Sequence, residues 1–178
     1  MQISYEISYI NPILGNGIIC REKIKKGSTI WLSNKISYNE VYKCQQYNNN
    51  FNVISDNITD YVNKIDKNKN VVTFNETNLE SFLINFSSYE KVKSFLDLSY
   101  GVSGDIHYIL DDGKYINHST EPNCITNMED ATTYALRDIE IGEMLTEDYS
   151  TYYHPKYLQQ ILQKYDCEPT YYKSIYNC

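Results

Sequence analysis

The chain has 178 residues, a formal net charge of −7 and a hydrophobic content of 42%. This length suits one domain with a core that needs neither disulfides nor metal, and the hydrophobic content excludes a disordered chain. The negative charge argues against direct binding to nucleic acid, which requires a basic surface, and suits either a basic partner or solubility alone.

The chain begins with a pattern of short strands. Residues 3–10 alternate Ile and Tyr with Ser and Glu, the period of a half-buried strand, and Asn11-Pro12 interrupts the pattern. Gly15-Asn16-Gly17 then leads into apolar runs at residues 18–20 and 29–32. We therefore expect small antiparallel strands in this part of the chain.

Residues 34–100 have a pattern typical of helices and loops rather than of strands. Within this segment, the polar stretch 48–70 is expected to be partly loop. Capping-box spacing, in which Ser or Thr precedes Glu by three residues, marks three expected helix starts: Ser37 with Glu40, Thr77 with Glu80, and Ser87 with Glu90.

The last third of the chain returns to a β pattern and then ends with a helical one. Strands are expected at residues 106–110, 124–127, 132–136 and 144–149. Pro155 suits the first turn of a helix, because apolar residues follow it at helical spacing: Leu158, Ile161, Leu162 and Tyr165. We find no internal repeat and no linker.

Cysteine use and hydropathy indicate the compartment. The five cysteines are scattered, odd in number and without a Cys-x-x-Cys pair, which argues against a disulfide framework and against a zinc site. No run approaches the ~18 apolar residues that span a bilayer, and the start lacks the layout of a secretory signal. We expect an intracellular protein without membrane association, in the cytoplasm or nucleus, or in the host cell if the source is a virus or a bacterium that secretes effectors.

Two segments of the second half carry the strongest signal. Residues 114–123 contain Asn-His-Ser followed by Pro122-Asn123, and residues 136–149 contain Gly-Glu-x-Leu-Thr-x-Asp-Tyr. In this order and spacing they resemble the two signature blocks of the SET domain, whose members mostly transfer a methyl group from S-adenosylmethionine to a lysine side chain. The Gly15-x-Gly17 turn, about a hundred residues earlier, agrees with the N-terminal signature of that family.

The resemblance implies a mixed α+β fold, mostly β, with small antiparallel sheets, a knot-like C-terminal crossing, a helical insertion and a C-terminal helix. It implies a SET domain in residues 1–153, within which 34–100 are a variable insertion. Residues 154–178 are then expected to form a helix and tail that close the site. Asn123 and Asp148 are expected to brace the crossing, together with Pro122.

The resemblance also assigns residues to S-adenosylmethionine: Gly15, Asn16, Gly17, Asn117, His118 and Tyr149. The Asn117 side chain offers two donors and an acceptor, which suits a polar ligand in a pocket. Glycines in the 15–17 turn allow positive φ and a close approach of the backbone to a ligand. His118 is expected to have a structural and cofactor role rather than that of a general base.

The resemblance places Tyr149 at the reaction centre as the catalytic residue. Methyl transfer is a direct displacement, so the enzyme aligns the reactants, excludes water and delivers an uncharged amine. The lysine pKa, near ~10.4 in solution, has to fall, and an apolar channel and the cationic sulfonium both lower it. A tyrosine hydroxyl can orient that amine without being a strong base.

The chain departs from the family pattern in two places. Glu147 stands where many members have Phe or Tyr, and it is expected to share a face of a strand with Tyr149 and to line the lysine channel with Tyr115 and Tyr108. We expect Glu147 to alter substrate choice or the number of methyl groups added. Thr120 replaces a Cys that accompanies a zinc cluster in many histone-directed members, so we expect no metal.

The sequence is compatible with three interpretations. The first is a protein-lysine methyltransferase that uses S-adenosylmethionine, and the second is a catalytically silent SET module that binds a protein partner. The third is an unrelated mixed α/β protein with accidental motifs. Intact Asn117, His118 and Tyr149 favour activity. The expected partner is a protein with an exposed lysine, for which a histone tail is the default by analogy; the sequence does not indicate an oligomeric state.

Overall fold

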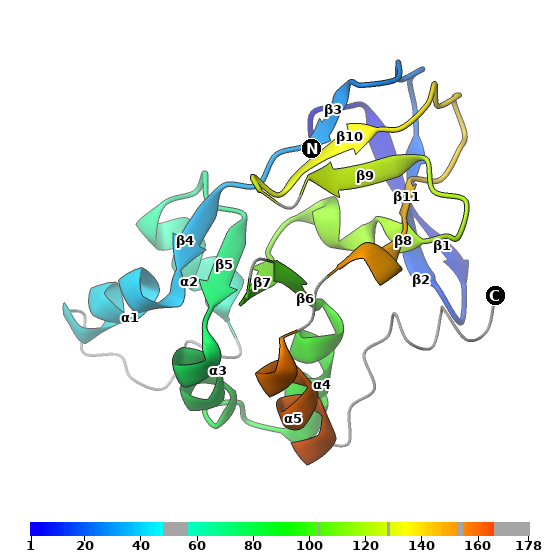
Figure 1. Cartoon of the computed structure of the whole chain (residues 1–178). Coiled ribbons are helices and arrows are strands. Elements are labelled where there is room, and N and C mark those ends of the chain that lie inside the picture. Colours follow the sequence, from blue (N-terminus) through cyan, green and yellow to red (C-terminus); the bar gives the residue numbers. More distant parts are fainter. Residues whose placement is uncertain (48–56, 103, 128, 153–154, 166–178) are drawn as a thin grey trace. The chain divides into compact units, whose positions relative to one another are not determined.

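The computed structural model describes residues 1–47, 57–102, 104–127, 129–152 and 155–165 (Figure 1). These residues form two compact units. The first unit consists of Met1–Ser33 and Asp112–Tyr152. The second consists of Asn34–Asp111 and the helix α5, Lys156–Lys164. Both units combine strands in small sheets with short helices, in agreement with the predicted mixed α+β class.

The first unit is built from short strands and two single-turn 3-10 helices. These elements are β1 (Tyr5–Asn11), β2 (Gly15–Cys20), β3 (Thr29–Trp31), η1 (Asp112–Tyr115), β8 (Asn117–His118), β9 (Cys124–Asn127), β10 (Thr132–Ala135), β11 (Thr146–Glu147) and η2 (Tyr149–Thr151). Three sheets result, in the orders β1-β2, β3-β10-β9 and β11-β8. The first two are antiparallel, whereas β11 and β8 pair in parallel, with Thr146 opposite Asn117 and Glu147 opposite His118.

The core of the first unit forms where β2 meets the segment that leads into β11. Leu145 donates its N–H to the carbonyl of Ile18 at 2.8 Å, and both side chains are fully buried. A second bridge joins Ile24 to Ile139, and Trp31 is also buried. Each such side chain contributes about 1.5–3 kcal/mol by leaving water. The core thereby fixes β2 against the residues that precede Tyr149.

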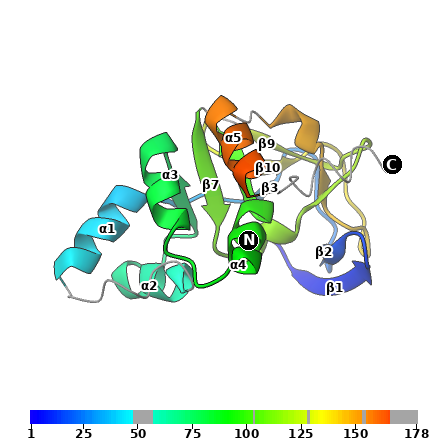
Figure 2. The same cartoon turned by 90° about the horizontal axis from the view of Figure 1, so that it is seen from below.

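The second unit packs five helices with a four-stranded sheet. Its elements are β4 (Lys35–Ser37), α1 (Tyr38–Tyr47), α2 (Ile58–Ile65), β5 (Val71–Phe74), α3 (Glu76–Leu83), α4 (Tyr89–Asp97), β6 (Ser99–Val102), β7 (Asp105–Ile109) and α5. The strand order is β4-β5-β7-β6, and only the β4-β5 pair is parallel. Helices α3, α4 and α5 lie near one another in both cartoon views (Figures 1 and 2). Their buried faces meet an aromatic cluster around Phe74, Phe82 and Phe95, whose ring centroids are 4.9–5.5 Å apart.

One of the three predicted capping boxes is confirmed. Glu40 accepts from the backbone N–H and the hydroxyl of Ser37, and Ser37 Oγ accepts from the N–H of Glu40. The prediction at Thr77 is wrong, because the N-cap of α3 is Asn75, two residues earlier, in a reciprocal box with Asn78. An Asn side chain serves a cap as well as Ser or Thr does.

The third predicted cap is displaced by one residue. Ser88, rather than Ser87, is the N-cap of α4, and its hydroxyl accepts from the N–H of Lys91. The predicted pairing of Ser87 with Glu90 is therefore wrong. Adjacent serines give the same local signal, and the register is decided by which helix face, carrying Val92 and Phe95, is buried in the core.

Two further segments differ from the expectation in extent, whereas the C-terminal helix is present as expected. Residues 48–70 are expected to be partly loop, but the described part of this stretch contains α2, whose Ile58 and Val62 are buried one helical turn apart. Residues 48–56 lie outside the described residues. The strand expected at 144–149 is reduced to Thr146–Glu147, because Asp148 caps η2 and turns the chain. The helix expected after Pro155 is present as α5, with Pro155 as its N-cap. The tail beyond residue 165 is not described, and the knot-like crossing stays a prediction.

Candidate active site

The first unit contains all of the predicted site residues except Tyr108. The glycine turn opens β2, Asn117 and His118 form β8, Glu147 ends β11, and Tyr149 starts η2. The pairing of β8 with β11 and the hydrogen bond from Leu145 to Ile18 hold these segments together. Residues that are about a hundred positions apart in the sequence therefore meet at one place.

Gly17 is required by close packing. A Cβ atom there would lie 2.8 Å from Ile10 Cγ1, 2.8 Å from Met144 Sδ and 2.9 Å from Asn117 Nδ2, all shorter than side chains tolerate. Gly15 has a different role, because it adopts a φ of 67° and a Cβ there would meet nothing within 4 Å. Gly17 thus allows a tight contact, and Gly15 allows a left-handed turn.

The Asn117 side chain links the glycine turn to β8. Its Nδ2 donates to the main-chain carbonyl of Asn16 at 3.0 Å and lies 3.7 Å from Met144 Sδ. Its backbone N–H donates to Leu145 O at 3.3 Å. Among the described residues nothing donates to Asn117 Oδ1, so the half-buried amide keeps an acceptor for a ligand.

His118 holds the backbone of Tyr149. Tyr149 donates its N–H to His118 Nδ1 at 3.1 Å, and the Asp148 carboxylate lies 3.9 Å from the same nitrogen. Because Nδ1 accepts, the proton of a neutral imidazole belongs on Nε2. His118 is only 6% exposed, and its Nε2 has no partner among the described residues. An N–H donor without a partner is thus buried beside Tyr149, a situation that usually costs free energy unless a ligand or water satisfies it.

The Tyr149 hydroxyl donates to the main-chain carbonyl of Ile116, the residue directly before Asn117. The ring lies 5.5 Å from His118 and 5.7 Å from Tyr152, centroid to centroid. Burial, and secondarily the charge of Glu147, raise the pKa of the Tyr149 hydroxyl well above its ordinary value. The hydroxyl therefore stays protonated at neutral pH and cannot serve as a base in its ionised form.

Glu147 lies in a buried cluster of hydroxyl groups. Its Oε1 accepts from Thr126 Oγ1 at 2.7 Å, and the Tyr152 hydroxyl donates to its Oε2. Thr126 in turn shares a hydrogen bond of 2.8 Å with Thr133. Burial raises the pKa of Glu147, while the bonds from Tyr152 and Thr126 act in the opposite direction. The carboxyl is 4% exposed, so its partners are these side chains rather than bulk water.

The premise that placed Glu147 and Tyr149 on one face of a strand does not hold. Strand β11 ends at Glu147, and Tyr149 belongs to the 3-10 turn that follows. Tyr115 lies in η1, half-buried, with Lys114 Nζ 5.2 Å from its ring centroid. Tyr108 lies in the second unit, on β7, where its ring stacks on Phe95 at 4.4 Å. The substrate channel stays a prediction for all three residues.

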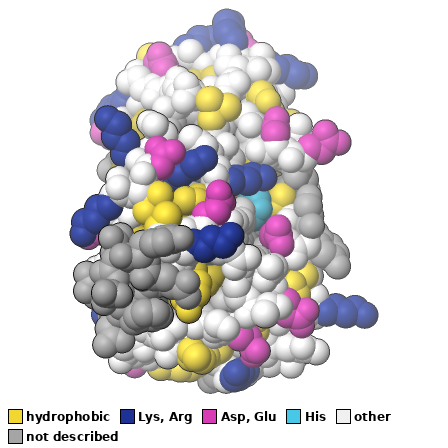
Figure 3. Space-filling view, turned by 90° about the vertical axis from the view of Figure 1, so that its left-hand side faces the viewer, with side chains coloured by type: hydrophobic (Ala, Val, Ile, Leu, Met, Phe, Trp, Pro, Cys, Tyr) yellow, Lys and Arg dark blue, Asp and Glu magenta, His cyan; other side chains and the backbone are white. Residues whose placement is uncertain are grey.

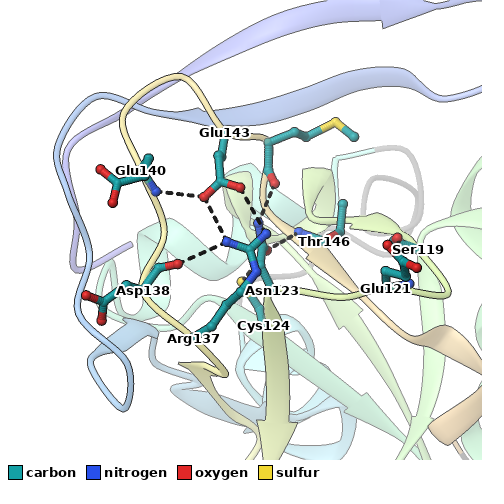
Figure 4. A network of polar contacts seen from close by, with 10 residues as sticks. Ser119, Glu121, Asn123, Cys124, Arg137, Asp138, Glu140, Glu143 and Thr146 are labelled. Atoms are coloured by element: carbon teal, nitrogen blue, oxygen red, sulfur yellow. Dashed lines mark hydrogen bonds and ion pairs between the residues drawn. The ribbon is translucent and has the colours of Figure 1, made fainter.

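Asn123 braces the loop between β8 and β9 against β11, as Figure 4 shows. Its Nδ2 donates to Met144 O at 2.8 Å, its Oδ1 accepts from the N–H of Thr146 at 2.9 Å, and Cys124 Sγ lies 3.2 Å from the same oxygen. Beside it, Arg137 forms a bidentate pair with Glu143, with both N–O distances 2.9 Å. This ion pair had no counterpart in the sequence interpretation, since its partners lie six residues apart in a loop, where no periodic pattern pairs them.

The described residues contain no group of three or more His, Cys, Asp or Glu side chains placed to hold a metal ion. Two of the cysteines, Cys167 and Cys178, lie outside that part of the chain. Within the described ranges no helix has the length and apolar character needed to cross a membrane. On the face shown in Figure 3, basic and acidic side chains are interspersed.

The comparison with curated proteins gives no match. Among solved structures, an autoinhibited conformation of ctPRC2 bound to S-adenosylmethionine matches with a TM-score of 0.54 and 12% identity, over 92% of this chain and 17% of that chain. An apo form of ctPRC2 with substitutions in Ezh2 matches with a TM-score of 0.52 and 12% identity, over 90% of this chain and 16% of that chain.

Likeness at this identity concerns the fold, and this chain spans about a sixth of the length of these two ctPRC2 chains. The family itself is given by the sequence. Residues 15–150 match the family model of the SET domain, a range that includes the glycine turn, β8 and Tyr149. The chain therefore belongs to the SET domain family.

Proposed function

We propose that this protein transfers a methyl group from S-adenosylmethionine to the side-chain amine of a lysine in a protein, with Tyr149 at the reaction centre. The observation that carries the proposal is the hydrogen bond from the hydroxyl of the half-buried Tyr149 to Ile116 O, the carbonyl directly before Asn117, together with the bond from the Tyr149 N–H to His118. Membership of the SET domain family supports the reaction class.

The residues of the first unit fit the proposed cofactor. Asn117 Oδ1 offers an acceptor, and His118 Nε2 is a buried donor without a protein partner among the described residues. Gly15 and Gly17 hold a turn from which the Asn16 side chain projects into solvent. S-adenosylmethionine, when bound, supplies a methyl group on an electrophilic sulfonium. Its presence in a ctPRC2 structure of the same fold supports this choice of cofactor.

In the proposed reaction Tyr149 positions the amine rather than deprotonating it. Its hydroxyl hydrogen is already engaged by Ile116 O, so the oxygen lone pairs are available to accept an N–H of the lysine. Such a contact directs the amine lone pair, which effects the alignment that displacement requires. The lysine arrives neutral because an apolar environment and a nearby cation both lower its pKa.

The substrate is proposed at the level of chemistry. A net charge of −7 suits a lysine-rich segment of a partner protein, and a histone tail is the default by analogy. Glu147, which replaces an aromatic residue, is proposed to alter substrate choice or the number of methyl groups added. For such a substrate the protein would act in the cytoplasm or nucleus, or in the host cell if the source is a virus or a bacterium.

The test is transfer of a radiolabelled methyl group from S-adenosylmethionine to core histones and to a whole-cell extract. Tyr149→Phe is compared with Tyr9→Phe, a matched control in which an exposed tyrosine (67%) loses the same hydroxyl. We expect labelled protein with the wild type and with the control, and a loss of about a hundredfold in Tyr149→Phe. Equal labelling by Tyr149→Phe would refute its place at the reaction centre. Binding of S-adenosylmethionine without any transfer would favour the silent binding module.

A further inference from the structure

The hydrogen bond between Glu147 and Tyr152 closes a short loop that contains Tyr149. The partners are five residues apart, at the end of β11 and just after η2. Between them, Asp148 Oδ1 accepts from the N–H of Ser150 at 3.0 Å, and Asp148 O accepts from Thr151 Oγ1 at 2.7 Å. The single turn that carries Tyr149 is thus tied at its two ends by one side-chain contact.

The far end of this turn is held by two backbone bonds, from the N–H of Thr151 to Asp148 O and from the N–H of Tyr152 to Tyr149 O, each 3.2 Å long, and by the side chain of Tyr152. A 3-10 turn of three residues has few backbone hydrogen bonds of its own. Its first residue is held by His118, through the Tyr149 N–H, whereas its last residues depend on Asp148 and on the Tyr152 contact. The other oxygen of the carboxyl accepts from Thr126 of β9, which also shares a hydrogen bond with Thr133 of β10.

We propose that Glu147 is a positioning residue: its carboxyl clasps Tyr152, closes the turn Asp148–Thr151, and so fixes Tyr149 for methyl transfer. The proposal rests on the proposed function for its effect on rate, whereas the clasp itself is a statement about structure. The contact is a hydrogen bond between the buried Glu147 carboxyl and the half-buried phenol of Tyr152, and the loss of a partner is costly for a buried carboxyl. In this account Glu147 affects the rate through its contact with Tyr152.

The variants are chosen to cut the clasp from either side. Tyr152→Phe removes only the hydroxyl, and Glu147→Met replaces the carboxyl by an apolar chain of similar length. Thr126→Val is the matched control, since it removes the other donor to the same carboxyl and leaves the clasp. We measure kcat for methyl transfer, the Kd for S-adenosylmethionine and the amide hydrogen exchange of residues 149–152.

We expect Tyr152→Phe and Glu147→Met each to lower kcat about tenfold, the equivalent of one hydrogen bond, with the cofactor Kd within about twofold of wild type. The double variant should fall no further, because either change alone already opens the clasp. Amide exchange at Ser150 and Tyr152 should accelerate about tenfold in both, and by much less in Thr126→Val.

If kcat of the double variant fell about a hundredfold, the product of the two single losses, the proposal would be overturned, because the two residues would then act separately. Unchanged exchange in Tyr152→Phe, or a change in kcat that Thr126→Val matches, would overturn it as well. If the wild type transfers no methyl group but exchange still accelerates in Tyr152→Phe, the clasp stands and the proposed function fails.

Discussion

The backbone N–H of Tyr149 donates a 3.1 Å hydrogen bond to Nδ1 of His118, a residue 31 positions earlier in the chain. The contact joins the two sequence blocks that define the family resemblance at the point where the reaction is proposed. It also fixes the proton of the neutral imidazole on Nε2, which is buried and has no partner among the described residues. His118 therefore links the backbone of the turn to a donor that a ligand can use.

We expect His118→Leu to lower the free energy of unfolding by about 1–3 kcal/mol, because the buried N–H of Tyr149 loses its acceptor. His118→Asn should recover about half of this loss, since an amide oxygen can stand near the position of Nδ1. Urea unfolding followed by the fluorescence of Trp31, the single tryptophan, measures both. Equal losses in the two variants would show that volume, and not the acceptor, matters at this position.

We expect Gly17→Ala to cost about 1–3 kcal/mol of stability, because its Cβ would overlap Ile10 and Met144 and would push the Asn117 amide from its place. Affinity for S-adenosylmethionine, measured by calorimetry, should fall about tenfold or more. The control is Gly27→Ala, which forces a residue with φ of 80° but meets no neighbour within 4 Å. It should cost about 1 kcal/mol and leave cofactor binding unchanged; an equal effect on binding would remove the packing argument.

The family and the main elements could be predicted from the sequence, because the patterns that indicate them are local. The alternation in residues 3–10 corresponds to β1, and the apolar spacing after Pro155 corresponds to α5. The ordered motifs identified the SET domain, which the family match over residues 15–150 confirms. Local patterns of this kind suffice when one face of an element meets one core.

The features that could not be predicted from the sequence depend mostly on contacts between residues that are far apart in the chain. The surroundings of Glu147 come from Thr126 and Thr133, on two other strands, and from Tyr152, beyond a turn that the strand pattern hid. The helix start at Glu76 differs from the prediction for a local reason, because Asn75 and Asn78 form the capping box in place of the Thr and Glu of the common pattern. Long-range contacts have no period in the sequence. The alternation of residues alone therefore predicted, incorrectly, that Glu147 and Tyr149 share one face of a strand.

We expect the purified protein to bind no zinc. The cysteines lack metal-site spacing, and Thr120 replaces the family cysteine that accompanies a zinc cluster. Elemental analysis after dialysis in metal-free buffer should find well under 0.1 equivalent, on the order expected of contamination. About one equivalent of zinc would contradict this expectation and would direct attention to Cys167 and Cys178.

The stability contributed by Glu147 should depend on pH. Burial raises its native pKa above the ordinary value of 4.5, so the native state binds more protons than the unfolded state in the window above 4.5. Stability therefore falls as the pH rises from about 4.5 through the native pKa, with a slope of at most about 1.4 kcal/mol per pH unit. Glu147→Gln cannot ionise, so the difference in unfolding free energy between variant and wild type should change across this window. A constant difference from pH 4 to 8 would show that the carboxyl has no raised pKa.

His107, in the second unit, should respond to pH in the opposite direction. Burial, with a smaller effect of Lys35, lowers its native pKa from 6.5 to about 4. The native state then binds fewer protons than the unfolded state between these values, so stability is complete above pH 6.5 and is lost as the pH falls towards 4. The full effect is about 3 kcal/mol, and His107→Gln should remove it.

The His107 titration can also be followed directly by NMR, because the chain has only three histidines and a His107→Gln spectrum assigns the His107 signal. We expect the His107 signal to titrate near pH 4, or to remain neutral until the second unit unfolds. The neighbouring ring of Tyr100, whose centroid is 5.6 Å from that of His107, offers an internal reporter. A midpoint near 6.5 would mean that water reaches the imidazole and that its 3% exposure understates access, which would also remove the acid instability expected for this unit.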